Sequence, residues 1–331
     1  MLKIGVLGVG HLGHIHLKCI QLVDQLELVG CYDIDEEKCK SMAAAYDIQA
    51  FERAEALIEA VDIVDIVTPT VSHFELAEKA IKSGRHLFIE KPLTHTIEQG
   101  RRLLKLGETH QVKIQVGHVE RFNPAFLALG EHDLAPMFIE AHRLAAFNPR
   151  GTDVSVILDL MIHDIDIVLS MVPSPLKSIS ASGVAVVSET PDISNARLEF
   201  ENGCVANLTA SRISLKQMRK LRLFQKDAYI SLDFLKKEAQ IVRLYEKGGS
   251  NVPPSDQFFE LETSQGAKLI HVEMPEIAEV NAIKMELESL ANSIEKDTRP
   301  IVDVSDGLRA LEVAHRIIDE IGRRGRMDVG C

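Results

Sequence analysis

Three glycines near the amino terminus have a spacing that can bind phosphate. Gly8, Gly10 and Gly13 form a G-x-G-x-x-G sequence directly after an apolar run that reads as a buried strand. In this pattern the first glycine permits a tight turn, the second lets a pyrophosphate approach the backbone, and the third lets a helix pack closely. The helix that follows would direct free N–H groups at the phosphates, and His11 and Leu12 lie inside the loop.

An acidic residue stands where a dinucleotide-binding loop requires one. Asp33 lies 20 residues after Gly13 and follows the next expected strand, residues 26–32. Its carboxylate can accept hydrogen bonds from an adenosine ribose diol and would repel a 2′-phosphate, for which Ile34 and Asp35 offer no arginine. We therefore predict an NAD site, with NADP disfavoured. The alternative is a glycine-rich turn that binds no cofactor.

Two further groups of residues could carry catalysis. Glu90, Lys91 and Pro92 follow an expected strand, although a lone lysine is commonly a surface residue. Asp159 and His163 are four residues apart, a spacing that places both side chains on one face of a helix. A carboxylate beside an imidazole can orient the ring and raise its proton affinity, but such a pair can also be a purely structural hydrogen bond.

The composition is that of a globular enzyme with two domains. The chain has 331 residues, 46% of them hydrophobic and 26% charged, and its formal net charge is −12. No long basic run is present, which disfavours binding to nucleic acid or to anionic membranes, and no apolar run is long enough to span a bilayer. Five cysteines without a C-x-x-C pair indicate reduced thiols and a cytoplasmic protein, and the first strand occupies the place of a signal peptide. We expect no metal site, since His14 and His16 point in different directions on their helix.

The first domain, residues 1–122, alternates strands with helices such as residues 36–46. This alternation predicts an α/β fold with a doubly wound parallel sheet, in which ligands bind beyond the carboxyl ends of the strands. Residues that could take part in binding follow successive strands at that edge: Gly8, Asp33, Thr68, Pro69, Glu90 and Lys91. The topology therefore gathers the candidate residues of this domain at one edge of the sheet.

The second domain, residues 123–331, has a different pattern. Several strands follow one another without intervening helices, which predicts an α+β domain with an open-faced, largely antiparallel sheet. We expect helices over residues 156–171 and from residue 276 to residue 296, and a polar loop over residues 246–266. A last helix should end in a frayed tail from Gly322.

The open face of this sheet predicts self-association. Alternating apolar residues in the segments 196–200 and 204–210 would be exposed to water on the side that the helices leave uncovered. The same face of another subunit would cover them. We therefore predict a homodimer or homotetramer formed through the second domain.

Together, these motifs resemble those of the Gfo/Idh/MocA family of oxidoreductases over nearly the whole chain. The glycine loop matches the cofactor loop of the family, and residues 68–73 match its T-P-x-x-x-H segment. Glu90-Lys91-Pro92 matches its most specific short motif, and Asp159-x-x-x-His163 matches its catalytic element. The resemblance implies an N-terminal Rossmann domain followed by an open-faced sheet domain.

The resemblance also implies roles for individual residues. Lys91 would hydrogen-bond the substrate oxygen that is oxidised, His163 would be the general base, and Asp159 would orient His163 or relay protons with it. A narrower likeness to nucleotide-sugar 3-dehydrogenases makes Arg121, Asn123 and Arg150 candidate substrate contacts, beside Asp159 and His163. The residues that would contact the cofactor are Gly8, Gly10, His11, Leu12, Gly13, Asp33, Thr68, Pro69, His73, Glu90 and Lys91.

The activity implied is hydride transfer between NAD and a secondary alcohol of a sugar, cyclitol or nucleotide-sugar. Two alternatives stay open, namely a reductase of another carbonyl or conjugated substrate on the same fold and a non-catalytic regulator that senses the dinucleotide. The intact set of Lys91, Asp159 and His163 argues against the regulator.

Overall fold

The chain forms two compact units. The computed structural model describes residues 1–130, 132–148, 154–249, 252, 258–264 and 266–327. The first unit comprises Met1–Phe122 and Asn281–Val313, and the second comprises Asn123–Val280 and Ala314–Cys331. The division after Phe122 coincides with the expected domain boundary, but the segment Asn281–Val313 does not belong to the second domain, where we expected it.

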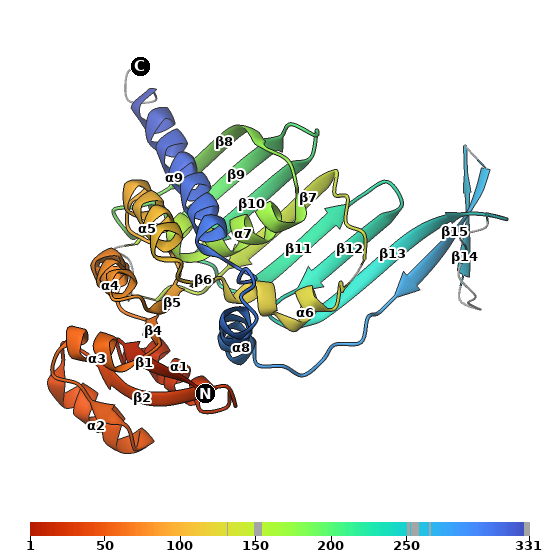
Figure 1. The fold of residues 1–331 in the computed structure, drawn as a ribbon. Coiled ribbons are helices and arrows are strands. Elements are labelled where there is room, and N and C mark those ends of the chain that lie inside the picture. Colours follow the sequence, from red (N-terminus) through yellow and green to blue (C-terminus); the bar gives the residue numbers. More distant parts are fainter. Residues whose placement is uncertain (131, 149–153, 250–251, 253–257, 265, 328–331) are drawn as a thin grey trace. The chain divides into compact units, whose positions relative to one another are not determined.

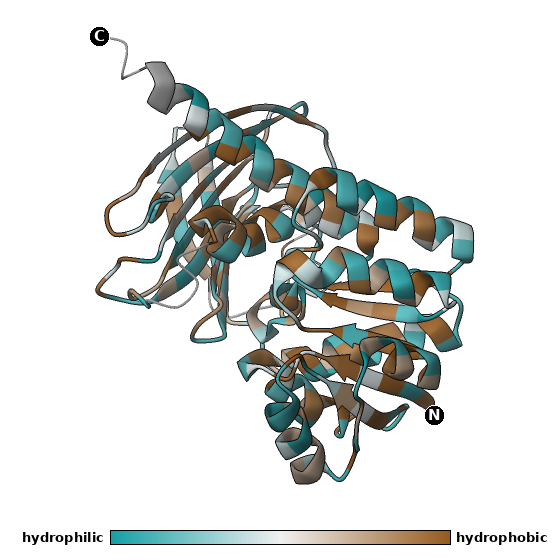
Figure 2. Ribbon diagram, turned by 90° about the vertical axis from the view of Figure 1, so that its left-hand side faces the viewer, coloured by the Kyte–Doolittle hydropathy of each residue, from teal (hydrophilic) through white to brown (hydrophobic). Residues whose placement is uncertain are grey.

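The first unit contains a six-stranded sheet in which every pair of neighbouring strands is parallel (Figure 1). The strand order is β3-β2-β1-β4-β5-β6. From β1, the strands β2 and β3 are added on one side and β4 to β6 on the other, as in a doubly wound sheet. Figure 2 shows these strands, close to the amino terminus, mostly in the hydrophobic colour, as expected for strands covered on both faces. The strands are β1 (Leu2–Leu7), β2 (Leu26–Tyr32), β3 (Gln49–Ala50), β4 (Ile63–Ile66), β5 (His86–Glu90) and β6 (Ile114–Gly117).

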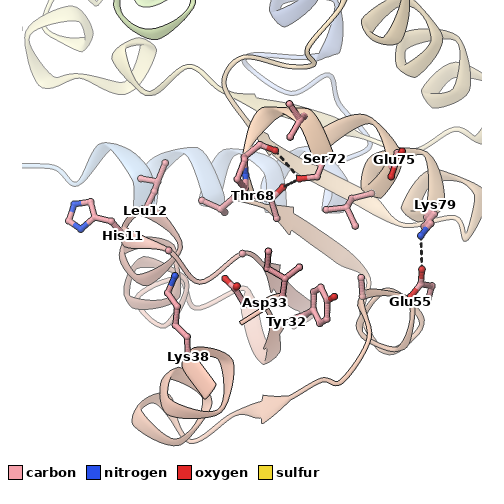
Figure 3. A pocket seen from close by; sticks show the side chains of 18 residues that line it. His11, Leu12, Tyr32, Asp33, Lys38, Glu55, Thr68, Ser72, Glu75 and Lys79 are labelled. Carbon is pink, nitrogen blue, oxygen red and sulfur yellow. Dashed lines mark hydrogen bonds and ion pairs between the residues drawn. The ribbon is translucent and has the colours of Figure 1, made fainter. Parts of the chain in front are cut away.

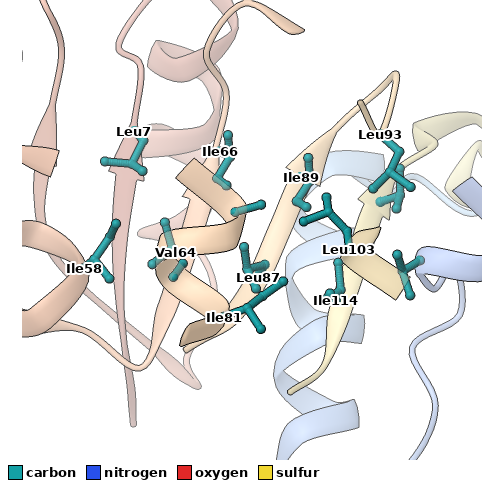
Figure 4. Close-up of a cluster of buried hydrophobic side chains, with 14 of the residues drawn as sticks. Leu7, Ile58, Val64, Ile66, Ile81, Leu87, Ile89, Leu93, Leu103 and Ile114 are labelled. Atoms are coloured by element: carbon teal, nitrogen blue, oxygen red, sulfur yellow. The ribbon is translucent and has the colours of Figure 1, made fainter. Parts of the chain in front are cut away.

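Helices cover both faces of this sheet and create two hydrophobic clusters. One cluster joins the sheet to α3, α4 and α5, and includes Ile58, Ile81 and Leu103 (Figure 4). The other joins it to α1, α2 and α8, and the apolar stripe of α8 explains why this late segment belongs to the first unit. The helices are α1 (His11–Ile20), α2 (Glu36–Tyr46), α3 (Ala54–Ala60), α4 (Thr70–Lys82), α5 (Ile97–His110), η1 (Val119–Phe122), α8 (Ala282–Glu295) and the amino-terminal part of α9 (Val304–Met327).

The second unit contains a nine-stranded, mostly antiparallel sheet, with one parallel pair between β7 and β10. The strand order is β14-β15-β13-β12-β11-β7-β10-β9-β8, and α7 contacts β7 and β10 on one face of the sheet. The strands are β7 (Phe138–Leu144), β8 (Leu176–Val184), β9 (Ile193–Phe200), β10 (Val205–Ser211), β11 (Met218–Phe224), β12 (Ala228–Asp233), β13 (Glu238–Glu246), β14 (Phe258–Thr263) and β15 (Gly266–Glu273). Its short helices are α6 (Pro124–Leu127), η2 (Ile157–Met161) and α7 (Ile162–Met171).

The apolar residues of β9 and β10 are buried, which contradicts the argument made for self-association. Ala196, Leu198 and Leu208 are fully buried on the side of the sheet that the helices cover. The residues that alternate with them are polar, among them Asn195 and Arg197. Because neighbouring side chains on a strand point to opposite faces, the open face is mainly polar at these strands.

Three expected elements differ from the structure in the second half of the chain. The segment 246–266 is not a continuous loop, because Phe258–Thr263 forms β14. The first closing helix begins at Ala282, six residues later than expected, where Asn281 caps it. The last helix continues beyond Gly322 to Met327. Among the described residues, none of the helices combines the length and the apolar composition needed to traverse a bilayer.

Candidate functional site

A pocket of about 690 Å³ lies at the carboxyl ends of β1, β2 and β4 (Figure 3). Its size is within the range of small-molecule sites, and its position is the ligand-binding edge of a doubly wound sheet. The lining residues come from the glycine loop, the end of β2, the turn after β4, and helices α2, α3 and α4. Those that the sequence predicted are Gly8, Gly10, His11, Leu12, Asp33, Thr68 and Pro69.

The three glycines of the loop meet different surroundings. Gly8 has a φ of 93°, and a Cβ built on it would lie 2.9 Å from the backbone nitrogen of Thr68. A Cβ on Gly13 would lie only 2.0 Å from the carbonyl oxygen of Gly8. A Cβ on Gly10 would have, among the described residues, only Lys38 Nζ within 4 Å, at 3.9 Å. Gly8 and Gly13 are therefore required by the loop itself, whereas Gly10 leaves open space.

The amino terminus of α1 presents its backbone donors beside that open space. Gly10 is the N-cap, with a φ of −64° and no side-chain capping hydrogen bond, and no acidic residue stands in the first turn. The first N–H groups of a helix have no partner inside the helix, so they are available to an anion. The residues present therefore fit a dinucleotide diphosphate at this end of the pocket.

Asp33 is held at the mouth of the glycine loop by two backbone donors. Its Oδ2 accepts a hydrogen bond from Val9 N at 2.8 Å, and its Oδ1 accepts one from Asp35 N at 3.0 Å. Each carboxylate oxygen can accept a second hydrogen bond. The carboxylate is therefore fixed in place and retains capacity for the two hydroxyls of a ribose.

Several residues that line the pocket were not predicted from the sequence. Tyr32, Ile34 and Lys38 line it beside Asp33, and the ion pair of Lys79 with Glu55, at 2.6 Å, stands at its other end (Figure 3). The position of Lys38 could have been foreseen, because it lies in the first turn of α2, directly after the acidic residue. The ion pair could not, since its members are 24 residues apart on different helices.

Four residues predicted to contact the cofactor do not line this pocket. Gly13 lies behind Gly8, and His73 is buried, with its ring nitrogens 2.8 Å from the carbonyl oxygen of Thr68 and 3.1 Å from that of Pro92. Burial lowers the pKa of His73, which favours the neutral ring, and a neutral ring has one N–H to donate to one of these two carbonyl oxygens. The other two lie at and after the end of β5: Glu90 is its last residue, and Lys91 follows it in the turn, where the Lys91–Pro92 peptide is cis.

The Asp159–His163 segment is a π-helical turn that continues into an α-helix, not one regular helix. Asp159 lies in η2 and His163 in the first turn of α7, and both side chains are half-buried. Local π-helical geometry is frequent at functional sites. The position of α7 on the sheet is fixed by a buried ion pair, in which Arg143 of β7 donates to Asp164 at 2.8 Å.

The three residues suggested as substrate contacts have different places. Arg121 lies in η1 and is half-buried. Asn123 is buried, caps α6 by accepting from Ala125 N at 3.0 Å, and donates to the carbonyl oxygen of Phe234 at 3.1 Å, so its side chain has structural bonds. Arg150 lies outside the described residues.

Known proteins resemble the chain over nearly its whole length. Residues 2–118 match the model of an oxidoreductase family with an NAD-binding Rossmann fold, and residues 105–230 match that of the GFO/IDH/MocA C-terminal domain. A UDP-N-acetylglucosamine 3-dehydrogenase of Acidithiobacillus ferrooxidans is 35% identical over 317 residues, which is 96% of each chain. A scyllo-inositol 2-dehydrogenase (NAD(+)) of Bacillus subtilis is 28% identical over 64% of this chain and 68% of its own. A solved structure of the Acidithiobacillus ferrooxidans enzyme has a TM-score of 0.86 and 33% identity, and the match covers 97% of both chains.

Proposed function

Because the chain belongs to the Gfo/Idh/MocA family of NAD-dependent oxidoreductases, we propose that it oxidises a secondary alcohol on the sugar ring of a nucleotide-sugar. The observation that carries this proposal is the likeness to a UDP-N-acetylglucosamine 3-dehydrogenase along almost all of both chains. The alcohol at C3 of UDP-N-acetylglucosamine is therefore the substrate group that we propose.

The pocket at the ends of β1, β2 and β4 would hold the cofactor. The backbone donors of the first turn of α1 would bind the diphosphate beside Gly10, and Asp33 would accept from the adenosine ribose. When bound, NAD supplies the acceptor for the hydride that leaves the alcohol carbon.

The chain's own residues would handle the proton and the charge. His163 has an imidazole suited to accept the hydroxyl proton near neutral pH, and Asp159, on the preceding turn, would orient the ring. Lys91 would donate to the alcohol oxygen and stabilise the negative charge that develops on it, a role that needs a cation.

The test is turnover with UDP-N-acetylglucosamine and NAD, followed by NADH absorbance and by mass spectrometry of a product that lacks two hydrogens. We expect Lys91→Ala and His163→Ala each to lower turnover by at least about 100-fold, with NAD affinity retained. Asp159→Asn should be milder than His163→Ala. Matched controls are Lys82→Ala and His110→Ala, which remove exposed side chains of the same types. Turnover of a cyclitol but not of the UDP-sugar would contradict the proposed substrate, and near-normal turnover of the Lys91 and His163 variants would contradict the proposed roles.

We also propose that the open face of the second unit's sheet mediates a homodimer or homotetramer. Phe138, Phe224 and Tyr229 lie side by side on adjacent strands, with ring centroids 6.1 Å and 5.0 Å apart. Aromatic residues are enriched in protein interfaces, and this cluster takes the place of the apolar residues first expected there. Light scattering at micromolar concentration should give a multiple of the chain mass, and a monomeric mass would contradict the proposal.

A further inference from the structure

A charged cluster is buried inside the first unit, directly below the turn that carries Lys91. His16 of α1 and Asp65 of β4 are fully buried, and Glu90 at the end of β5 is 7% exposed. None of the three lines the pocket at the glycine loop. Buried charges are costly unless they are paired, so the cluster needs an explanation beyond packing.

His16 lies between two carboxylates. Its Nδ1 is 2.9 Å from Asp65 Oδ2, and its Nε2 is 3.1 Å from Glu90 Oε1. An imidazolium donates from both ring nitrogens, so it matches a position between two carboxyl groups. A further neighbour is apolar: the ring of Phe88 and the imidazole are in edge contact, with centroids 5.4 Å apart.

The electrostatics agree with this geometry. Burial lowers the pKa of His16, but the charge of Asp65 and the hydrogen bonds to Asp65 and Glu90 outweigh it, so the pKa is well above its ordinary value of 6.5. The ring is therefore positively charged at neutral pH and forms ion pairs with Asp65 and Glu90.

The second oxygen of Glu90 is bound to the backbone of Lys91. Glu90 Oε2 accepts a hydrogen bond from Lys91 N at 3.1 Å. Gly117, the partner of Glu90 in the β5–β6 register, leaves room for the carboxylate, because a Cβ there would lie 2.9 Å from Oε1. The carboxylate thus has one position, fixed by His16, by Lys91 N and by the absence of a side chain at Gly117.

We propose that His16 is a positioning residue for the reaction: by holding Glu90 against the Lys91 backbone, it fixes the place of the Lys91 side chain. The proposal rests on the proposed function, in which Lys91 contacts the substrate oxygen. His16 belongs to the helix whose amino terminus would bind the diphosphate, so one helix would serve both the cofactor and the catalytic lysine. Without the imidazolium, Glu90 Oε1 would lose its hydrogen bond to His16, and the carboxylate that accepts from Lys91 N would be held less firmly.

Substituting His16 by glutamine or by asparagine tests its two hydrogen bonds one at a time. Glutamine can place its amide nitrogen near Nε2, toward Glu90, whereas asparagine reaches only the position of Nδ1, toward Asp65. For His16→Asn we expect kcat to fall by about 10- to 100-fold, the scale of a catalytic group misplaced by about 1 Å. The affinity for NAD, measured by titration, should change less than about threefold. His16→Gln should recover part of the lost kcat.

Two further variants keep the test decisive. Gly117→Ala displaces the Glu90 carboxylate without touching His16, and we expect the same loss of kcat with NAD affinity retained. His14→Gln, two residues earlier on the exposed side of the same helix, is the matched control and should retain wild-type turnover. If the His16 variants fold poorly, Gly117→Ala answers the same question.

The outcomes distinguish this inference from the proposed function. If Lys91→Ala is inactive but His16→Asn or Gly117→Ala has the kcat of the wild type in the same assay, the positioning role alone is overturned. Equal loss of kcat and of NAD binding in both variants would also overturn it, because it would indicate a merely structural cluster. Near-normal turnover of Lys91→Ala would overturn the role of Lys91, and the inference with it.

Discussion

The contrast between Gly10 and Gly13 gives a sharp prediction about the cofactor loop. Gly10 has backbone angles that alanine adopts, and a Cβ there meets nothing among the described residues closer than 3.9 Å. In Gly10→Ala, restriction of the unfolded chain stabilises by about 0.4–1 kcal/mol, and a poorer N-cap costs a similar amount. We therefore expect the free energy of unfolding without cofactor to change by less than about 1 kcal/mol.

The same substitution should impair cofactor binding. The new methyl group would occupy the space in which a diphosphate approaches the backbone, so we expect NADH affinity to fall at least about tenfold, or about 1.4 kcal/mol. Urea unfolding without cofactor measures the first effect, and titration of NADH fluorescence measures the second. Gly322→Ala, on an exposed helix turn where a Cβ meets nothing within 4 Å, is the matched control.

Gly13→Ala should behave differently. Its Cβ would lie 2.0 Å from the carbonyl oxygen of Gly8, so the backbone must move, at a cost of about 1–3 kcal/mol or more. In Gly13→Ala, both stability and NADH affinity should therefore fall. In Gly10→Ala, NADH affinity should fall while stability stays nearly unchanged. Wild-type NADH affinity in Gly10→Ala, or unfolding of that variant without cofactor, would refute the assignment of the open space to the diphosphate.

Three other substitutions test the remaining parts of the structure. Asp33→Ala should narrow the preference for NAD over NADP, because it removes a repulsive carboxylate from a pocket that Lys38 also lines; an unchanged ratio of the two dissociation constants would contradict this. Burial raises the pKa of Asp192, but backbone hydrogen bonds, among them one from Val187 N at 2.7 Å, hold it well below its ordinary value. Its stabilising effect is therefore present above about pH 4, the unfolded pKa, and is lost as the pH falls toward the folded one, so the deficit of Asp192→Asn in urea unfolding should shrink below about pH 4. Arg143→Ala leaves the Asp164 carboxylate buried without its cation and should cost about 3–5 kcal/mol in the same assay, whereas a loss below about 1 kcal/mol would show that this ion pair does not stabilise the second unit.

Local sequence signals specify much of the first unit. Helix α2 has the bounds expected from the sequence, because Asp35 caps it by accepting from Lys38 N, and Asp47, with a φ of 53°, ends it. The glycine spacing and Asp33 likewise predict the pocket, since each residue acts through its own backbone conformation or through near neighbours. Such features depend on interactions between residues close in sequence, which a pattern can reveal.

Features that depend on distant residues were not predictable in this way. His16 meets Asp65 and Glu90, which lie 49 and 74 positions away, and nothing in the spacing of the three residues indicates a cluster. Strand β14 has no buried face, so its sequence lacks the alternation that marks a strand beside a core. The expected exposure of apolar residues on the open sheet face was wrong because alternation gives two faces but does not say which one the helices cover.

The membership of Asn281–Val313 in the first unit has a consequence for the order of events during synthesis. Leu287, Leu290 and Ala291 complete a hydrophobic cluster whose other members lie between Ile4 and Phe88. When the first 122 residues have left the ribosome, one face of their sheet therefore still lacks helix α8. At about 5–20 residues per second, helix α8 is complete about 9 to 35 s later. During that interval Asn123–Val280 of the second unit is synthesised, whereas the nascent first unit carries an exposed apolar surface that chaperones can bind.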